Sequence, residues 1–322
     1  EQVGLYTINL TLSREGKEDY HETLYFYGVD ESTIKLGQSQ AAFLGDDGKF
    51  TYVPDYRGNQ ILDYSNSGYM GGGISLPDIQ ARIVLEPDEN SEDDTARIQA
   101  AIDRVSAMPM NENGFRGAVL LKKGVYKIEG TLNIMASGIV LRGEGSGSEG
   151  DWDGKDSTVI YATGTTQRNV IQVGTEMYPE QVGQTAVKIL DHYVPVGAKT
   201  FTVEDARDYR VGDDIYVIRR GNDRWINEID MDSIYPREGA NATIQWGPFN
   251  MQFDRVITKI EGNQITIDAP LGQAIETRWG GGEIVKYRDT RIENVGIEGL
   301  RVDVQVNPAT FTDDTDSSVS DS

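Results

Sequence analysis

The chain has 322 residues, with 52 acidic against 30 basic side chains, so its formal net charge is −22. This charge excludes a basic nucleic-acid-binding domain as the default interpretation. The chain has no cysteine, which excludes disulfide frameworks, thiolate nucleophiles and cysteine-ligated zinc. Its two histidines disfavour a histidine-rich metal site or a histidine-based triad. Any chemistry must therefore come from carboxylate, arginine, lysine or tyrosine side chains.

No stretch of the sequence approaches the roughly 18 consecutive apolar residues that a membrane span needs. The chain begins at Glu1 with neither a methionine nor a signal-peptide core. We therefore expect a soluble segment of a processed protein, without a membrane span.

Residues 1–62 are typical of a small β-rich module. Leu5–Leu12 alternates apolar and polar side chains, and Leu24–Tyr27 is an aromatic run rich in strand-forming residues. Gly45–Gly48, between two apolar segments, predicts a hairpin turn.

The spacing of apolar residues predicts one clear helix, from Asp94 to about Ala107. Asp94 and Thr95 are candidate caps, and Pro109 ends the pattern. The apolar side chains recur at the i, i+3, i+4, i+7 spacing of a helix face: Ile98, Ala101, Ile102 and Val105.

A short-period repeat follows this helix. Short apolar segments begin 20 residues apart at Gly117–Leu121, Ser137–Leu141 and Ser157–Tyr161. Shorter β segments lie between or after them at Val125–Ile128, Thr131–Ile134 and Asn169–Val173. Such spacing is typical of stacked coils, because each coil buries its inner face only against its neighbours. The gaps are too short for the helical crossovers of a doubly wound sheet.

The short-period repeat is absent from residues 187–271. There, expected strands separated by Gly-Asp and Gly-Asn turns predict an inserted antiparallel β subdomain. It contains a long connection, about 221–250, of a length that is usually functional or disordered. Residues 272–306 resume the coil pattern, at Glu283–Tyr287 among other segments, and the acidic Ser/Thr-rich residues 307–322 predict a disordered tail. The remaining segment, 63–186, holds the helix and the first coils.

The run Asp93–Asp103, followed by Gly117–Leu121, Gly124–Tyr126 and Ile139–Gly145, resembles the start of the pectate-lyase-like superfamily. This superfamily of right-handed parallel β-helices includes polysaccharide lyases, glycoside hydrolases, epimerases and adhesins. The resemblance covers about residues 63–174 and resumes at 283–303. It implies an all-β fold, namely an incomplete right-handed parallel β-helix with an N-terminal capping helix and an inserted antiparallel subdomain. It also implies a polysaccharide partner and an extracellular, cell-surface or periplasmic location, but it transfers no catalytic residue.

One loop carries candidate metal ligands. Asp151, Asp153 and Asp156 surround Gly154, and such an oxygen-rich turn suits Ca²⁺. The alternative is a solvated turn in which Asp and Gly serve turn geometry alone. No organic cofactor is expected.

The candidate substrate-binding residues are Trp225, Trp246 and Trp279, because flat aromatic faces stack on sugar rings. The alternative for each tryptophan is packing within the inserted subdomain. A lyase acting on a uronate must stabilise carboxylate charge and remove the C5 proton. Arg224, Tyr235 and Arg237 are the nearest set for that chemistry, and His192 is an alternative base with a structural role as its other interpretation.

These features predict a carbohydrate-active protein, with polysaccharide β-elimination as the first hypothesis for the intact protein. Glycoside hydrolysis, a non-catalytic glycan-binding or adhesive module, and a structural cap for a missing catalytic region are the alternatives. A surface with a charge of −22 repels a polyanion unless a basic groove or bound cations offset it. The charge therefore favours a cation-assisted site or a less charged glycan.

Overall fold

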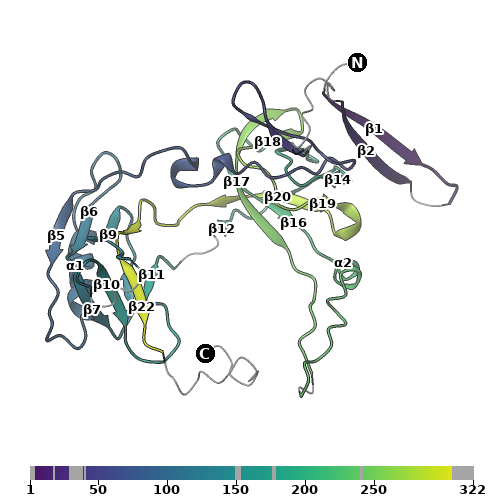
Figure 1. Ribbon diagram of the computed structural model, residues 1–322. Helices are drawn as coiled ribbons and strands as arrows, with labels where there is room; N and C mark the ends of the chain where they lie inside the picture. The colour runs from purple at the N-terminus through teal and green to yellow at the C-terminus, as the bar shows by residue number, and fades with distance from the viewer. Residues whose placement is uncertain are drawn as a thin grey trace. The chain divides into compact units, whose positions relative to one another are not determined.

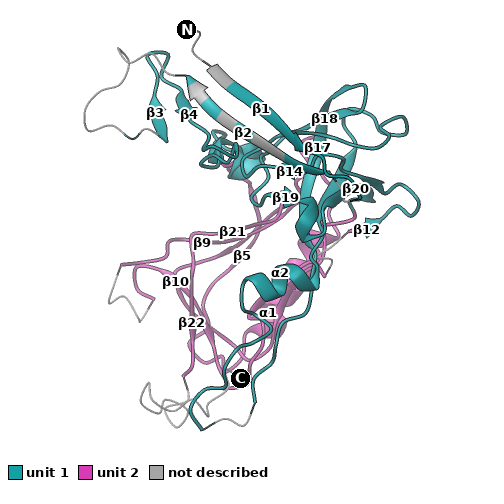
Figure 2. Ribbon diagram, turned by 90° about the vertical axis from the view of Figure 1, so that its right-hand side faces the viewer, with its two compact units in different colours: residues 1–75, 180–289 teal, residues 76–179, 290–322 magenta. Residues whose placement is uncertain are grey.

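The computed structural model describes residues 4–16, 19–28, 39, 41–148, 154–175, 179–239 and 242–306. The chain divides into two compact units (Figure 2). Unit 1 comprises residues 1–75 and 180–289, and unit 2 comprises residues 76–179 and 290–322. No helix in these described ranges has the length and apolar character to cross a membrane.

Unit 2 is a parallel β-helix, which confirms the predicted fold class. Its described strands form three ladders in which all pairings are parallel (Figure 1). The first contains β5 (Ala81–Leu85), β6 (Gly117–Leu121), β9 (Ile139–Gly143) and β21 (Gly296–Glu298); the second contains β7 (Gly124–Ile128), β10 (Thr158–Ala162) and β22 (Arg301–Val304); the third contains β8 (Leu132–Ile134) and β11 (Ile171–Val173). Two members of the 20-residue repeat, Gly117–Leu121 and Ser137–Leu141, correspond to β6 and β9, which are neighbours in the first ladder. The third member, Ser157–Tyr161, corresponds to β10, which lies in the second ladder beside β7, so the repeat is only partly a repeat of coils.

The core of unit 2 is formed by the inward-facing side chains of these ladders. Leu121, Leu141 and Ile160 come from β6, β9 and β10 and are completely buried. Helix α1 (Thr95–Ser106) packs Ile98 and Ile102, also completely buried, against the same core. The helix predicted from the apolar spacing is confirmed, and it covers one end of the strand core as a cap does.

The start of α1 differs in detail from the expected cap. Asp94 occupies the capping position, but its buried carboxylate instead binds the Arg97 guanidinium at 2.6 Å and accepts a bond from the Lys127 amide. The neighbouring Asp93 accepts from the backbone amides of Thr95 and Glu129 at 2.9 and 3.1 Å. The acidic run therefore serves the helix end and ties it to the strand that contains Lys127.

Unit 1 is built mainly on one antiparallel sheet, as predicted for the inserted segment. Its strand order is β12 (Glu180–Gln181), β20 (Gly282–Arg288), β16 (Asp214–Arg219), β17 (Met251–Glu261), β18 (Gln264–Ile267) and β15 (Thr200–Thr202), with β13 (Val187–Lys188) also on β20. A separate pair joins β14 (Tyr193–Val194) to β19 (Ile275–Glu276). The buried core includes Ile215, Val217, Ile265 and Ile284.

The strand at Glu283–Tyr287 corrects one expectation. It was predicted to resume the β-helix, but it lies within β20, which pairs antiparallel with β16 in unit 1. An apolar strand presents the same alternating pattern to a parallel or an antiparallel neighbour, so its sequence does not reveal the direction of pairing. The β-helix resumes only at β21 and β22, which pair in parallel with β9 and β10.

The N-terminal segment also belongs to unit 1 rather than standing apart. It contains the hairpin β1 (Gly4–Leu12) with β2 (Tyr20–Gly28), and the hairpin β3 (Ala42–Leu44) with β4 (Phe50–Tyr52), whose predicted turn is confirmed. Asn59 accepts a bond from the Val196 amide at 3.0 Å, and Asn66 donates to the Asp268 carbonyl at 2.7 Å. Hydrogen bonds between residues far apart in sequence therefore hold the segment to the antiparallel core.

Candidate functional site

The candidate site lies in unit 1, where two short elements bring arginine side chains to one tryptophan. Helix α2 (Asp223–Glu228) carries Arg224, and the 3₁₀ turn η4 (Thr277–Trp279) carries Arg278 and Trp279. The guanidinium carbons of Arg224 and Arg278 lie 5.4 and 4.5 Å from the centre of the Trp279 ring. The Trp279 side chain is half-buried and both arginines are exposed, so cations and an aromatic face are presented together.

Asn222 joins these two elements. Its amide nitrogen donates to the Arg278 carbonyl at 3.1 Å, and its side-chain oxygen accepts from the Trp225 amide at 2.9 Å, which caps α2. Gly280 ends η4 with φ 117°, and a Cβ there would lie 2.9 Å from the Arg220 carbonyl oxygen. The position of Arg224 relative to Arg278 is thus fixed by a side-chain bridge and a glycine-dependent turn.

An ionic network extends the site beyond the tryptophan. Glu276 pairs with Arg57 at 3.2 Å and also with Arg278. The Arg57 guanidinium lies 4.1 Å from the centre of the Tyr193 ring, and the Tyr193 hydroxyl donates to Asn59 at 2.6 Å. Burial raises the pKa of Tyr193 against the opposing effects of Asn59 and Arg57, so this phenol stays protonated and serves as a donor.

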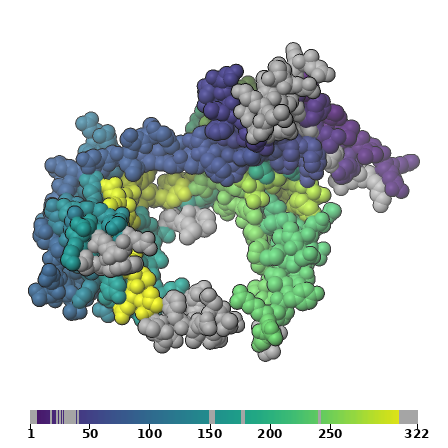
Figure 3. Space-filling view, in the orientation of Figure 1, coloured from purple at the N-terminus to yellow at the C-terminus, as the bar shows by residue number. Residues whose placement is uncertain are grey.

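The other two tryptophans lie in a neighbouring aromatic cluster. Phe249 contacts Trp225 with ring centres 4.9 Å apart and Trp246 with ring centres 5.8 Å apart. The buried guanidinium of Arg219 stacks 4.0 Å from the Trp225 ring. Trp225 therefore packs inside the unit, whereas Trp246 is 45% exposed. The segment that carries Trp246 lies on the molecular surface, drawn in green in Figure 3.

Arg219 shows how strongly this region is desolvated. Its Nε donates to the Ala274 carbonyl at 3.3 Å, and one terminal nitrogen has no hydrogen-bond partner among the described residues. Burial lowers the pKa of Arg219, and the charge of Glu276 opposes that shift. Glu276 thus interacts with three guanidinium groups, those of Arg57, Arg219 and Arg278.

The structure brings together only part of the predicted catalytic set. Arg224 lies at the Trp279 site. Tyr235 is 91% exposed and Arg237 is also exposed, and within the described structure neither makes a hydrogen bond or ion pair. His192 stacks on His21 with ring centres 4.3 Å apart, and its carbonyl accepts from the Thr277 amide at the start of η4. These contacts give His192 a structural role beside the site.

The predicted metal ligands fall largely outside the described residues. Asp151 and Asp153 lie there, and Asp156 is described and exposed. Within the described ranges, no group of three histidine, aspartate or glutamate side chains is arranged to hold a metal ion. The calcium site remains a prediction from the sequence.

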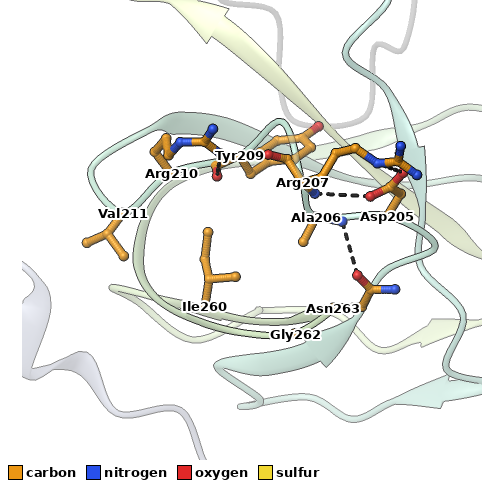
Figure 4. Close-up of a pocket in the computed structure, with 9 residues that line it drawn as sticks. All are labelled: Asp205, Ala206, Arg207, Tyr209, Arg210, Val211, Ile260, Gly262 and Asn263. Carbon is orange, nitrogen blue, oxygen red and sulfur yellow. Dashed lines mark hydrogen bonds and ion pairs between the residues drawn. The ribbon is translucent and has the colours of Figure 1, made fainter.

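A separate open cavity of about 470 Å³ lies between the 205–211 turn and the tip of the β17–β18 hairpin (Figure 4). Arg210 donates to the carbonyls of Arg207 and Tyr209, and the Arg207 Nε pairs with Asp205 at 2.6 Å. The Ala206 amide donates to Asn263 across the cavity at 3.3 Å. These polar groups brace the turn, and no predicted site residue lines the cavity.

Sequence reasoning missed four members of the site: Arg57, Tyr193, Glu276 and Arg278. Arg278 immediately precedes Trp279 and Glu276 lies three residues before it, so the charged sequence beside that tryptophan was a usable signal. Arg57 and Tyr193 reach the site only through tertiary packing, and no local motif marks them.

Comparison with known proteins gives only distant structural neighbours. No family model and no curated protein matches the sequence. The tailspike gp61 of Pseudomonas phage phi297 is 16% identical, with a TM-score of 0.32 over 67% of this chain and 28% of that chain. The Gp54 tailspike of Acinetobacter baumannii bacteriophage AP22, solved in complex with A. baumannii capsular saccharide, is 12% identical, with a TM-score of 0.33 over 67% of this chain and 27% of that one.

The tailspike protein gp49 from Pseudomonas phage LKA1 is 17% identical, with a TM-score of 0.33 over 66% of this chain and 29% of that one. The chain thus spans less than a third of the length of each of these tailspikes. Likeness at this level assigns no activity, so the function must be argued from the residues of the chain itself.

Proposed function

We propose that the chain is an extracellular carbohydrate-active protein that binds an acidic polysaccharide at the Trp279 site. The observation that carries the proposal is the placement of two guanidinium groups, from Arg224 and Arg278, over a half-buried tryptophan. A tryptophan face stacks on the apolar face of a sugar ring, and arginine matches a carboxylate with two parallel hydrogen bonds. The combination suits a sugar that carries a carboxylate.

The charge of the whole chain supports the same choice. A surface of net charge −22 repels a polyanion, so a site for one must concentrate positive charge locally. Arg57, Arg224 and Arg278 supply that charge, and Glu276 orients two of them. An uncharged glycan has no need of this arrangement.

The reaction proposed for the intact protein is β-elimination. An arginine beside the uronate carboxylate stabilises the charge that develops when the C5 proton is removed. Arg224 is the residue proposed for that role, Tyr235 is the proposed base, and Arg237 is the proposed second cation. The base must come within hydrogen-bonding distance of the proton when substrate is bound.

A non-catalytic binding module is the second candidate. The observation that favours it is the position of Tyr235, whose side chain is 91% exposed and makes no contact with the described residues of the Trp279 site. A site that only binds needs the tryptophan and the arginines but no base. Activity assays therefore decide between the two candidates.

The binding test uses the full chain with polygalacturonate as the acidic probe and galactan as the neutral one. We expect Trp279→Ala to weaken polygalacturonate binding by about tenfold or more, since a stacked aromatic at a binding centre contributes more than 1 kcal/mol. Trp246→Ala is the matched control, because Trp246 is half-exposed and no arginine among the described residues lies over its ring. Equal affinity of Trp279→Ala and the unmodified protein would overturn the proposal.

The activity test follows unsaturated-product absorbance and reducing ends together, with and without Ca²⁺. Growth of absorbance supports β-elimination, and Tyr235→Phe should then abolish it while leaving binding intact. Reducing ends without absorbance would indicate hydrolysis. Binding without either product would establish the non-catalytic module.

A further inference from the structure

We propose that unit 2 carries a second site, which binds the carboxylate of an acidic sugar in a lysine-lined pocket beside Gly124. The pocket has a volume of about 430 Å³. This volume lies within the usual range for small-molecule sites, about 300 to 1,000 Å³. Its residues are distinct from those of the Trp279 site in unit 1.

Three separate segments of unit 2 form the pocket. They are the connection between β5 and α1, the start of β7, and the residues that precede β10. The charged side chains that line it are Asp88, Glu89, Lys123, Lys127 and Lys155. Three lysines and two carboxylates thus line the pocket, in a chain where carboxylates outnumber basic groups.

Two glycines form the base of the pocket and allow its segments to approach. A Cβ on Gly124 would lie 2.6 Å from Pro87, and one on Gly154 would lie 2.8 Å from the carbonyl carbon of Gly124. Both residues also have positive φ, at 139° and 69°. Side chains at these positions would force the segments apart, so the glycines maintain the concave surface.

The ammonium groups of Lys123 and Lys127 differ in the hydrogen bonds and ion pairs that they already form. Lys127 pairs at 3.1 Å with Glu92, which is 88% exposed, and such an exposed pair is weak. The Lys123 ammonium forms no hydrogen bond or ion pair within the described residues, although its backbone amide binds Glu144. Lys122, which does not line the pocket, is instead paired with Glu144 at 2.7 Å. Lys123 is thus the cation best placed to meet an incoming anion.

The two carboxylates narrow the class of ligand. Asp88 and Glu89 repel a dianion such as phosphate more strongly than a singly charged carboxylate, and they accept hydrogen bonds from hydroxyl groups. A ligand with one carboxylate and several hydroxyls, as in a uronic acid, satisfies both kinds of side chain. The pocket therefore favours an acidic sugar over inorganic phosphate.

The test uses the full chain carrying Trp279→Ala, which removes the site proposed in unit 1, and digalacturonate as the probe in calorimetry. We expect residual binding that Lys123→Ala weakens by about tenfold, and that falls with added salt. Lys122→Ala is the matched control and should change affinity by less than about twofold. Thermal unfolding of each variant confirms that the fold is retained.

Two further probes make the outcome decisive. Cellobiose, which is neutral, and inorganic phosphate should each bind more weakly than digalacturonate. Equal binding by either probe, no residual binding in the Trp279→Ala chain, or no effect of Lys123→Ala would overturn the second site. Loss of binding on lysine substitution but not on Trp279→Ala would instead support this site and refute the one in unit 1.

Discussion

Arg57 and Glu276 form an ion pair of 3.2 Å between the N-terminal segment and β19 of unit 1. Glu276 is only 14% exposed and binds Arg278 as well, so its loss leaves two guanidinium groups without their shared partner. We expect Glu276→Gln to reduce the free energy of unfolding by about 1 to 2 kcal/mol in urea denaturation. Glu261→Gln is the control, because the Lys259–Glu261 pair is 60% exposed on both sides and should contribute less than about 1 kcal/mol. Equal effects of the two substitutions would contradict the role given to Glu276.

Asn222 is expected to affect binding without touching the ligand. Asn222→Ala removes both the α2 cap and the bond to the Arg278 carbonyl, so Arg224 and Arg278 lose their fixed separation. Stability should fall by about 1 kcal/mol, the usual cost of losing such a cap. Polygalacturonate affinity should fall as well. Asn227→Ala, on the same helix but bonded to Asp232, should leave affinity unchanged, and an equal loss in both variants would refute this positioning role.

Gly138 is predicted to be irreplaceable within the β-helix. Its φ is 83°, and a Cβ there would lie 2.5 Å from the Gly114 carbonyl oxygen. Gly138→Ala should therefore cost more than the roughly 1 kcal/mol attributable to backbone strain alone. Gly164 has the same φ, and the nearest atom to its Cβ would be an arginine side-chain nitrogen at 3.9 Å. Thermal unfolding should show a larger loss for Gly138→Ala than for Gly164→Ala; similar losses would exclude a steric cause.

Asp93 makes part of the stability of unit 2 dependent on acid pH. Burial alone would raise the pKa of its carboxyl, but hydrogen bonds from Thr95 and Glu129 outweigh burial and lower the pKa below its usual value of about 3.9. A lowered folded-state pKa gives stability that is present above the unfolded-state value and is lost as pH falls through the folded-state value. Asp93→Asn keeps an acceptor oxygen but does not titrate. It should lose less stability than the unmodified protein between about pH 4 and pH 2; parallel curves would contradict this.

The predicted calcium loop is tested by adding and removing the ion. Binding only to the folded chain raises stability in proportion to the logarithm of ligand concentration, by about 2.7 kcal/mol at a hundred times the dissociation constant. Ca²⁺ should therefore raise the melting temperature, chelator should reverse the rise, and Asp153→Asn with Asp156→Asn should abolish it. An unchanged melting temperature in the unmodified protein would leave the loop as a solvated turn.

The elements that the sequence predicted well are those whose signal is local. The spacing of Ile98 and Ile102 predicted α1, and short apolar segments predicted β6, β9 and β10. The 20-residue period was right for β6 and β9, which are neighbours in one ladder, but β10 lies in another ladder beside β7. The direction of β20 was not predictable in this way. Its alternation is satisfied equally by an antiparallel neighbour, and only the three-dimensional pairing with β16 distinguishes the two.

The candidate site was predictable only in part, for a similar reason. Arg224 was found because basic and aromatic residues stand out in the long connection 221–250, and Trp279 was found because a tryptophan face can stack on a sugar ring. The proximity of Arg224 to Trp279 was not predictable, because it depends on Asn222, which links two elements that are distant in sequence. Arg57 is even more distant in sequence, near the N-terminus. Its contact with Glu276 exists only once the N-terminal segment has packed on the antiparallel core.

The parallel pairing of β9 with β21 has a consequence for how the molecule assembles. These neighbouring rungs are separated in sequence by the whole of residues 180–289, which fold into another unit. While that stretch is unfolded, closing so long a loop costs chain entropy, and the cost falls once the stretch has collapsed into a compact body. We therefore expect the rungs before the insertion to form early and the β21–β22 rung to dock late. Its backbone amides would then be the last in the β-helix to gain protection from hydrogen exchange.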